Sequence, residues 1–233
     1  MGVLDGRVAL VAGASSGIGL ATAVAFADAG ASVHAVARRP IDAADRITTH
    51  QLDVSDRAAV DALAAEWEGP LDALVVAAGV NVKERRLEQL APETWDQLIA
   101  TNLTGSFNLV RAFLDRLREA RGDVVLIGSV SGNWPDISGA AYQASKAAVL
   151  ALTRGVGFEV NGEIRCTAIL PGVVDTEILD NRPEPPSAEQ RAQMLRPEDV
   201  AAACVFACNL PPRAFVPELT ILPTALQSIG KTT

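Results

Sequence analysis

Residue types that build metal centres and cross-links are scarce in this chain of 233 residues. It has only three cysteines and two histidines, and the cysteines lack the spacing of a metal site. Cys204 and Cys208 lie four residues apart on a predicted helix, and with Cys166 we interpret them as buried thiols. We therefore expect no metal, no disulfide framework and a cytoplasmic location.

The chain also lacks a net positive charge and long apolar runs. The formal net charge is -8 and the sequence pI is about 4.8, which argues against nucleic acid as a partner. The longest apolar runs, such as residues 73–80, span about eight residues, whereas a membrane-spanning helix needs roughly 20. An acid and a glycine interrupt the first six residues, so we expect neither a signal peptide nor a membrane partner.

The residues that are abundant favour a layered α/β protein. Apolar residues make up 49% of the chain, enough to bury a large core. Short apolar runs, typical of buried parallel strands, alternate with helical segments from the N-terminus onward. We predict one domain over residues 1–233, of the α/β class: a Rossmann-like, doubly wound parallel sheet with helices on both faces.

The element boundaries follow from apolar runs, caps and breakers. The predicted strands are 7–12, 32–37, 48–52, 71–77, 123–127, 163–170 and 218–222. The predicted helices are 17–29, 56–67 with Ser55 as its cap, 92–120 with a bend near Gly105, 138–160 and 197–209. The polar, proline-containing segment 175–195 is predicted to be a mobile loop.

A glycine-rich turn follows the first predicted strand. Its residues are Gly13, Ala14, Ser15, Ser16, Gly17, Ile18 and Gly19, a G-x-x-x-G-x-G spacing. Such a turn lets the backbone approach a pyrophosphate, and the helix that follows points its N–H groups at the anion. This position after the first strand indicates a dinucleotide site, although a plain tight turn is the simpler alternative.

The same letters also fit G-x-S-x-G, the nucleophile turn of serine hydrolases. That function needs an acid and then a histidine further along the chain. His34 and His50 follow the motif too closely, and we interpret both as structural or surface residues. The hydrolase alternative is therefore disfavoured.

The end of the second predicted strand bears on which dinucleotide binds. An acidic residue there would hold the ribose 2′-hydroxyl of NAD, but the residues are Ala37, Arg38 and Arg39. A guanidinium at Arg38 suits a 2′-phosphate, so we predict NADP(H) in preference to NAD(H). Solvated loop charges are the alternative. Asp53 and Val54, after the third strand, are placed to meet the adenine edge.

The only tyrosine, Tyr142, lies four residues before Lys146, one of three lysines. On a helix these two side chains share a face. A nearby ammonium should lower the pKa of the tyrosine from about 10 and make it a proton donor and acceptor. Ser129 precedes the tyrosine by thirteen residues, just after the fifth strand. A surface pair is the alternative.

Taken together, these motifs resemble the short-chain dehydrogenase/reductase family. The matching segments are AGASSGIG (12–19), LDV (52–54), AAG (77–79), TNLTG (101–105), IGS (127–129), YQASK (142–146) and PGVVDT (171–176). The resemblance implies a seven-stranded Rossmann-like sheet and hydride transfer between a nicotinamide and a small-to-medium carbonyl or secondary alcohol. It also implies a homodimer or homotetramer joined through helices 103–120 and 138–160.

The resemblance assigns roles to individual residues. Tyr142 becomes the general acid and base, Lys146 also holds the nicotinamide ribose, Ser129 binds the substrate oxygen and Asn102 holds a relay water. The implied cofactor-binding residues are Gly13, Ser15, Ser16, Gly17, Ile18, Gly19, Arg38, Asp53, Val54, Ala78, Gly79, Tyr142, Lys146, Pro171, Gly172, Val174 and Thr176. Trp134, Pro135, Val173, Ile178 and Leu179 are expected to form a mostly apolar substrate wall.

Two departures from the family pattern occur. The usual Asn-Asn-Ala-Gly after the fourth strand is Val76-Ala77-Ala78-Gly79, and the usual Thr-Gly of the glycine turn is Ala12-Gly13. A catalytically idle protein that senses a dinucleotide on the same fold is the alternative function. The sequence does not identify the substrate or the direction of the reaction.

Overall fold

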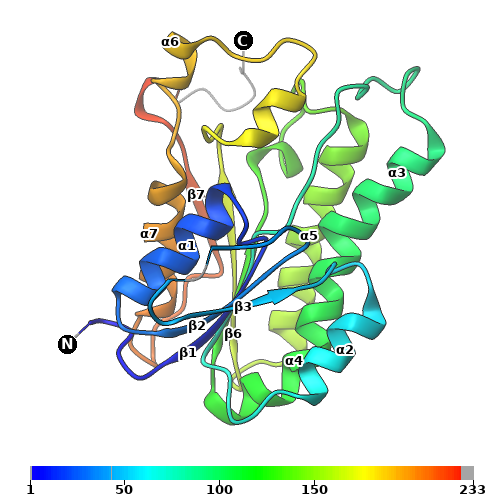
Figure 1. Ribbon diagram of the computed structural model, residues 1–233. Coiled ribbons are helices and arrows are strands. Elements are labelled where there is room, and N and C mark those ends of the chain that lie inside the picture. The colour runs from blue at the N-terminus through cyan, green and yellow to red at the C-terminus, as the bar shows by residue number, and fades with distance from the viewer. Residues whose placement is uncertain (1, 43, 227–233) are drawn as a thin grey trace.

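The computed structural model describes residues 2–42 and 44–226, and its centre is a seven-stranded sheet in the order β3-β2-β1-β4-β5-β6-β7 (Figure 1). Every neighbouring pair is parallel. The strands are β1 (Val8–Ala12), β2 (Ser32–Ala37), β3 (Ile47–Gln51), β4 (Ala73–Val76), β5 (Asp123–Ile127), β6 (Arg165–Pro171) and β7 (Glu218–Ile221). The predicted doubly wound parallel sheet is confirmed.

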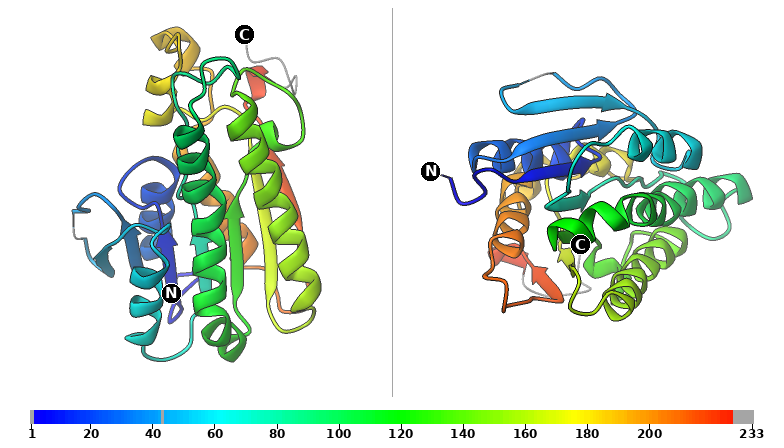
Figure 2. Two further views of the ribbon diagram at one scale, coloured as in Figure 1. Left: turned by 90° about the vertical axis from the view of Figure 1, so that its right-hand side faces the viewer. Right: turned by 90° about the horizontal axis from the view of Figure 1, so that it is seen from below.

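Helices cover both faces of the sheet (Figure 2). They are α1 (Gly17–Asp28), α2 (Arg57–Ala65), α3 (Pro92–Ile99), α4 (Gly105–Ala120), α5 (Ala140–Glu159), α6 (Ala188–Arg191) and α7 (Pro197–Cys208). Side chains of α1 and α7, such as Phe26 and Cys204, pack with Val11 in one core. Side chains of α2, α4 and α5, such as Phe113 and Val149, pack with Leu10 in the core on the other face.

The strand sequences explain which strands lie inside. Leu10 and Val11 of β1 are neighbours on opposite faces, and both are fully buried. A strand covered on both faces needs such a continuous apolar run. Strand β3, with the sequence ITTHQ, has exposed and half-buried residues and forms one edge of the sheet.

Two local predictions need comment. The bend predicted near Gly105 is a π-helical turn over Ala100–Thr104 between α3 and α4. The cap of α2 is Asp56, not Ser55, because Asp56 accepts hydrogen bonds from the N–H groups of Ala58 and Ala59. The hydroxyl of Ser55 instead donates to Asp53.

The segment predicted as a mobile loop, 175–195, has regular structure. It contains a 3-10 helix over Glu177–Asn181 and the short helix α6. Arg191 joins its two parts through ion pairs with Asp175, at 2.6 Å, and with Asp180. Proline content and polarity indicated a loop, but the segment contains these two helical turns, and the ion pairs of Arg191 connect them.

None of the helices among the described residues is long and apolar enough to cross a membrane.

Candidate active site

A cavity of about 670 Å³ opens at the carboxyl ends of the strands. This is the edge where open parallel sheets bind their ligands. Apart from Asn102, every residue that the sequence assigned to catalysis or cofactor binding lines this cavity. Those residues lie at or after the ends of β1 to β6 or belong to the start of α1 and to α5, so the fold brings the separate motifs to one place.

The glycine turn forms one end of the cavity, and its geometry requires glycine. Gly13 has φ +84°, and a Cβ there would lie 2.6 Å from the backbone nitrogen of Ala78. The turn therefore packs directly on the residues after β4.

The start of α1 is left open toward the cavity. Ser16 is at the cap position but makes no side-chain capping bond to the helix, whereas Asp56 caps α2 with two. The first N–H groups of a helix have no partner within it. Uncapped groups at a cavity wall can hold a phosphate, so α1 fits the pyrophosphate of a dinucleotide.

Two arginines stand at the end of β2. Arg39 donates to the hydroxyls of Ser16, at 2.8 Å, and Ser15, at 3.4 Å, and pairs with Glu177 at 3.0 Å. Arg38 is 3.7 Å from Asp53. Both arginines line the cavity. The sequence analysis predicted that Arg38 binds the 2′-phosphate. In the structure it is Arg39 whose guanidinium is hydrogen-bonded to the serines of the glycine turn.

Tyr142, Lys146 and Ser129 converge in the middle of the cavity. The Nζ of Lys146 lies 5.8 Å from the centre of the Tyr142 ring and donates to the carbonyl of Ile127 at 2.8 Å. Ser129 follows β5, and its hydroxyl accepts from the N–H of Ser131 at 3.1 Å. The sequence-predicted trio is therefore one cluster, from α5 and the end of β5.

The pKa of Tyr142 differs from the predicted direction. Burial of its hydroxyl raises this pKa to about 12, and a hydrogen bond with Ser129 acts the other way. Burial also lowers the pKa of Lys146 to about 8. The prediction that the ammonium dominates is wrong for the protein alone, because desolvation is the largest influence on the pKa of Tyr142 and the one that shifts the pKa of Lys146.

Asn102 lies behind the cavity wall. It is buried in the π-helical turn, and its amide exchanges hydrogen bonds with the backbone of Val80 at 2.8 and 3.1 Å and donates to Ser145 at 3.0 Å. The hydroxyl of Ser145 donates to the carbonyl of Tyr142 at 2.7 Å. Asn102 thus links the loop after β4 to the helix that carries Tyr142.

The far end of the cavity, beyond Tyr142, is charged. Arg85, Asp136 and Arg182 line the cavity and are close enough to act on the charge of the Tyr142 hydroxyl. Val173, Ile178 and Leu179 also line the cavity. Trp134 and Pro135 are exposed and do not line the cavity, so the predicted apolar wall is only partly right. Sequence reasoning missed the three charged residues because they lie in segments without periodicity or motif.

The remaining candidates for chemistry lie outside the cavity. All three cysteines are buried thiols, as predicted. His34 and His50 pair with each other at 2.9 Å on β2 and β3. Within residues 2–42 and 44–226, no group of three His, Cys, Asp or Glu side chains is arranged to hold a metal ion.

Comparison with known proteins agrees with this geometry. The model of the "short chain dehydrogenase" family matches residues 7–187. The chain belongs to the short-chain dehydrogenase family. Like other members of this family it is an oxidoreductase with a fold that binds NAD or NADP.

Particular short-chain dehydrogenases are similar over most of the chain. The 2,3-dihydro-2,3-dihydroxybenzoate dehydrogenase of Escherichia coli (strain K12) is 39% identical over 180 residues, 75% of this chain and 72% of that protein. A serine dehydrogenase solved with NADP+ is 30% identical with a TM-score of 0.88, covering 97% of this chain and 99% of its own. An alcohol dehydrogenase from the archaeon Thermococcus sibiricus, solved with 5-hydroxy-NADP, is 29% identical with a TM-score of 0.82, covering 95% and 98%.

Proposed function

We propose that this short-chain dehydrogenase, acting as a single domain, interconverts a small-to-medium carbonyl compound and its secondary alcohol and prefers NADP(H). The observation that carries the proposal is the convergence of Tyr142, Lys146 and Ser129 on the wall of the cavity that also holds the open start of α1.

Each of the three side chains has a chemical task. Bound nicotinamide supplies the hydride for reduction or accepts it in the reverse direction. The hydroxyl of Tyr142 donates a proton to the forming alcohol oxygen, or accepts one in reverse. Ser129 donates a hydrogen bond to the same oxygen. Lys146, held by the carbonyl of Ile127, supplies the positive charge that favours the phenolate when the cofactor's own charge is added.

Asn102 is proposed as a positioning residue in this reaction. Its bonds to Val80 and Ser145 hold the wall of the cavity against the second turn of α5. The predicted relay water would then lie between Asn102 and Lys146, and this part of the proposal rests on the family resemblance.

The preference for NADP(H) is supported by the end of β2. Ala37 ends this strand and Arg38 and Arg39 follow it, so no acidic side chain comes directly after the strand to hold a ribose 2′-hydroxyl. Two guanidinium groups at the cavity wall suit the negative charge of a 2′-phosphate. The solved relatives bound to NADP+ and 5-hydroxy-NADP are consistent with this choice.

Oligomerisation through α4 and α5 is proposed from their exposed apolar residues. Phe107 of α4 is 41% exposed and Phe158 of α5 is 86% exposed. Exposed aromatic side chains on neighbouring helices are typical of protein interfaces. A homodimer or homotetramer would cover them, and the cytoplasmic location stays a prediction from the sequence.

The decisive test is Tyr142→Phe. We expect turnover of NADPH with a carbonyl substrate to fall by about 10²–10⁴-fold, the usual contribution of a positioned acid. NADPH binding, followed by fluorescence titration, should be retained. Wild-type turnover in this variant would disprove the mechanism. NADPH binding without turnover of any compound in a broad carbonyl panel would instead favour the idle sensor.

Because Tyr142 is the only tyrosine, its ionisation can be measured without interference. Ultraviolet absorbance of the tyrosinate should show a pKa of about 12 in the protein alone. Saturation with NADP+ should lower that pKa, since the oxidised nicotinamide adds a positive charge beside the phenol. An unchanged pKa would show that the cofactor does not bind next to Tyr142.

A further inference from the structure

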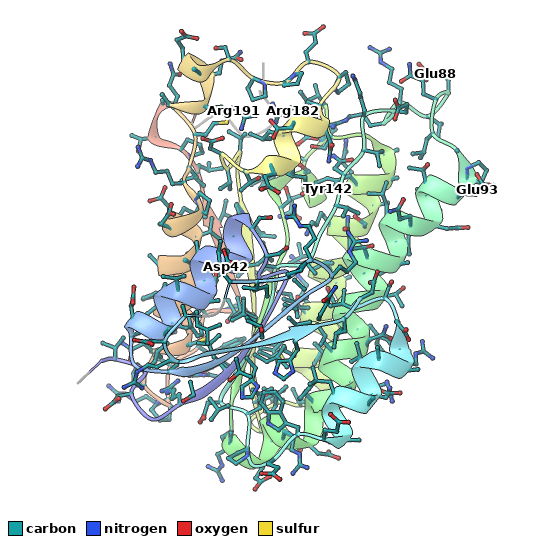
Figure 3. All side chains as sticks on the ribbon, viewed as in Figure 1. Asp42, Glu88, Glu93, Tyr142, Arg182 and Arg191 are labelled. Carbon is teal, nitrogen blue, oxygen red and sulfur yellow. The ribbon has the colours of Figure 1, made fainter. Side chains whose placement is uncertain are left out.

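Two arginines from distant segments meet at the end of the cavity beyond Tyr142. Arg85 follows β4, and Arg182 directly follows the 3-10 helix after β6. Figure 3 labels Arg182 above Tyr142, with Arg191 further along the same segment. Both Arg85 and Arg182 are close enough to act on the charge of the Tyr142 hydroxyl.

Arg85 is a fixed part of the wall. It is buried, and its guanidinium donates to the carbonyls of Val82, at 2.9 Å, and Asn181, at 2.5 Å. The amide of Asn181 donates in turn to the carbonyl of Asn81 at 3.2 Å. These hydrogen bonds hold the segment that carries Arg182 against the loop after β4, and we call this contact the latch.

Arg182 is held at this wall without a bonding partner of its own. Its half-buried guanidinium makes no hydrogen bond or ion pair with any residue in 2–42 or 44–226. Arg191, nine residues later, is by contrast paired with two carboxylates. A guanidinium group that lines a cavity and has no protein partner is available to bind an anion.

The nearby carboxylate does not neutralise this pair. Asp136 accepts from the hydroxyl of Ser131, at 2.5 Å, and from the N–H of Ser138, at 2.8 Å, and forms no ion pair with either arginine. Burial lowers the pKa of Arg85, and the charge of Arg182 lowers it further. With Arg85 and Arg182 positive and Asp136 negative, these three side chains together carry one net positive charge, which suits a monoanion.

We propose that the substrate is an oxo acid or hydroxy acid whose carboxylate binds Arg182, beside Arg85, while its carbonyl or hydroxyl meets Tyr142. This inference rests on the proposed function and names the substrate class of the same cavity. A planar carboxylate pairs with a guanidinium through two parallel hydrogen bonds, which fixes the orientation of the substrate. Arg182 is thus a specificity-determining residue.

The test compares ketones that differ only in the carboxylate. Acetoacetate and methyl acetoacetate, then laevulinate and methyl laevulinate, are assayed by NADPH oxidation. We expect the wild type to prefer each acid over its ester. In Arg182→Met, KM for the acids should rise about 10–100-fold, the loss expected for one charge-assisted hydrogen-bonded contact, while kcat/KM for the esters stays within about twofold.

Two further variants separate charge from packing. Arg182→Lys keeps the positive charge and should recover part of the preference for acids. Arg86→Met is the matched control, because Arg86 is the exposed neighbour of Arg85 and pairs only with Glu88, at 3.8 Å, among the described residues. This control variant should leave KM for the acids and kcat/KM for the esters unchanged.

A binding measurement distinguishes failure of this inference from failure of the proposed function. Butyrate and butyramide are titrated calorimetrically into the wild-type NADP+ complex and the Arg182→Met complex. If no ketone is reduced but butyrate binds through Arg182, the proposed function is wrong and the carboxylate site stands. If ketones are reduced with no preference for acids, or if Arg182→Met leaves that preference intact, the inference is wrong and the function stands.

Discussion

The two ends of the cavity hold their arginines differently. At the glycine-turn end, which we call the near end, Arg38 faces Asp53 and Arg39 faces Glu177, so each positive charge has a carboxylate within 4 Å. At the far end, Arg85 is bonded only to backbone carbonyls, and Arg182 has no bonded partner among the described residues.

This difference indicates that the far end, and not the near end, depends on a ligand to balance its charge. At the near end the charges are balanced without a ligand, and backbone N–H groups, hydroxyls and the two guanidinium groups are together available to bind the dinucleotide. The second end holds two like charges together with one carboxylate that is already hydrogen-bonded. An anion bound there relieves an unfavourable arrangement, so specificity should be concentrated at the far end and affinity for the dinucleotide at the near end.

Replacing Gly13 should have the largest effect, because the near end depends on backbone geometry. We expect Gly13→Ala to destabilise the fold by about 2–5 kcal/mol, combining a left-handed φ with overpacking against Ala78. Cofactor binding should be lost with it. Urea denaturation and NADPH titration measure the two effects.

Gly6→Ala is the matched control for that change. Gly6 has a similar φ of +77°, but a Cβ there meets nothing within 4 Å. It should cost only about 1–2 kcal/mol and leave NADPH binding unchanged. Equal losses in the two variants would mean that conformation alone, and not the contact with Ala78, explains the glycine.

The double variant Arg38→Met/Arg39→Met should have the next largest effect, again at the near end. We expect kcat/KM with NADPH to fall about 10–100-fold, since contacts between charged groups and a 2′-phosphate are lost, with NADH little changed. The preference for acids over esters should survive. A wild-type enzyme that uses NADH as well as NADPH would contradict the cofactor proposal.

Acidification should lower the stability of the fold through His34 on β2 and His50 on β3. Burial lowers the pKa of both rings, and the charge of His50 adds to the effect on His34. The unfolded state then takes up protons first, so this contribution to stability is present above about pH 6.5 and is lost as the pH falls below it. Water still reaches both rings, so we expect a loss below about 1 kcal/mol.

Thermal unfolding between pH 7.5 and 5.5 measures this effect. The slope of Tm against pH should be smaller in His50→Gln than in the wild type. The same slope in both proteins would show that other groups govern the acid response.

Arg191→Met should have the smallest effect, and it should be confined to the far end. The ion pairs of Arg191 with Asp175 and Asp180 are partly exposed, so their loss should cost about 0.5–1 kcal/mol at most. Segment 175–195 should become easier to cleave in limited proteolysis, and KM for acids should rise a few-fold through Arg182. NADPH affinity should not change. A loss of NADPH affinity would mean that the two ends are coupled.

Much of the near end and of the catalytic cluster could be predicted from the sequence. The turn at Gly13 and the i,i+4 pair of Tyr142 and Lys146 are local patterns, and the structure brings them to one cavity. The sequence analysis assigned the cap of α2 to Ser55, but the cap is Asp56, because either residue type can cap a helix. The pKa of Tyr142 was predicted in the wrong direction because burial is not visible in a local pattern.

The sequence by itself determined the parallel α/β class, the turn at Gly13 and the shared face of Tyr142 and Lys146. Each of these depends on local spacing or on a backbone conformation that only certain residues adopt. Only the tertiary structure decided the latch between Arg85 and Asn181, which are 96 positions apart, and the open guanidinium of Arg182. Such contacts depend on which strand ends the topology places side by side, and no spacing along the chain encodes that.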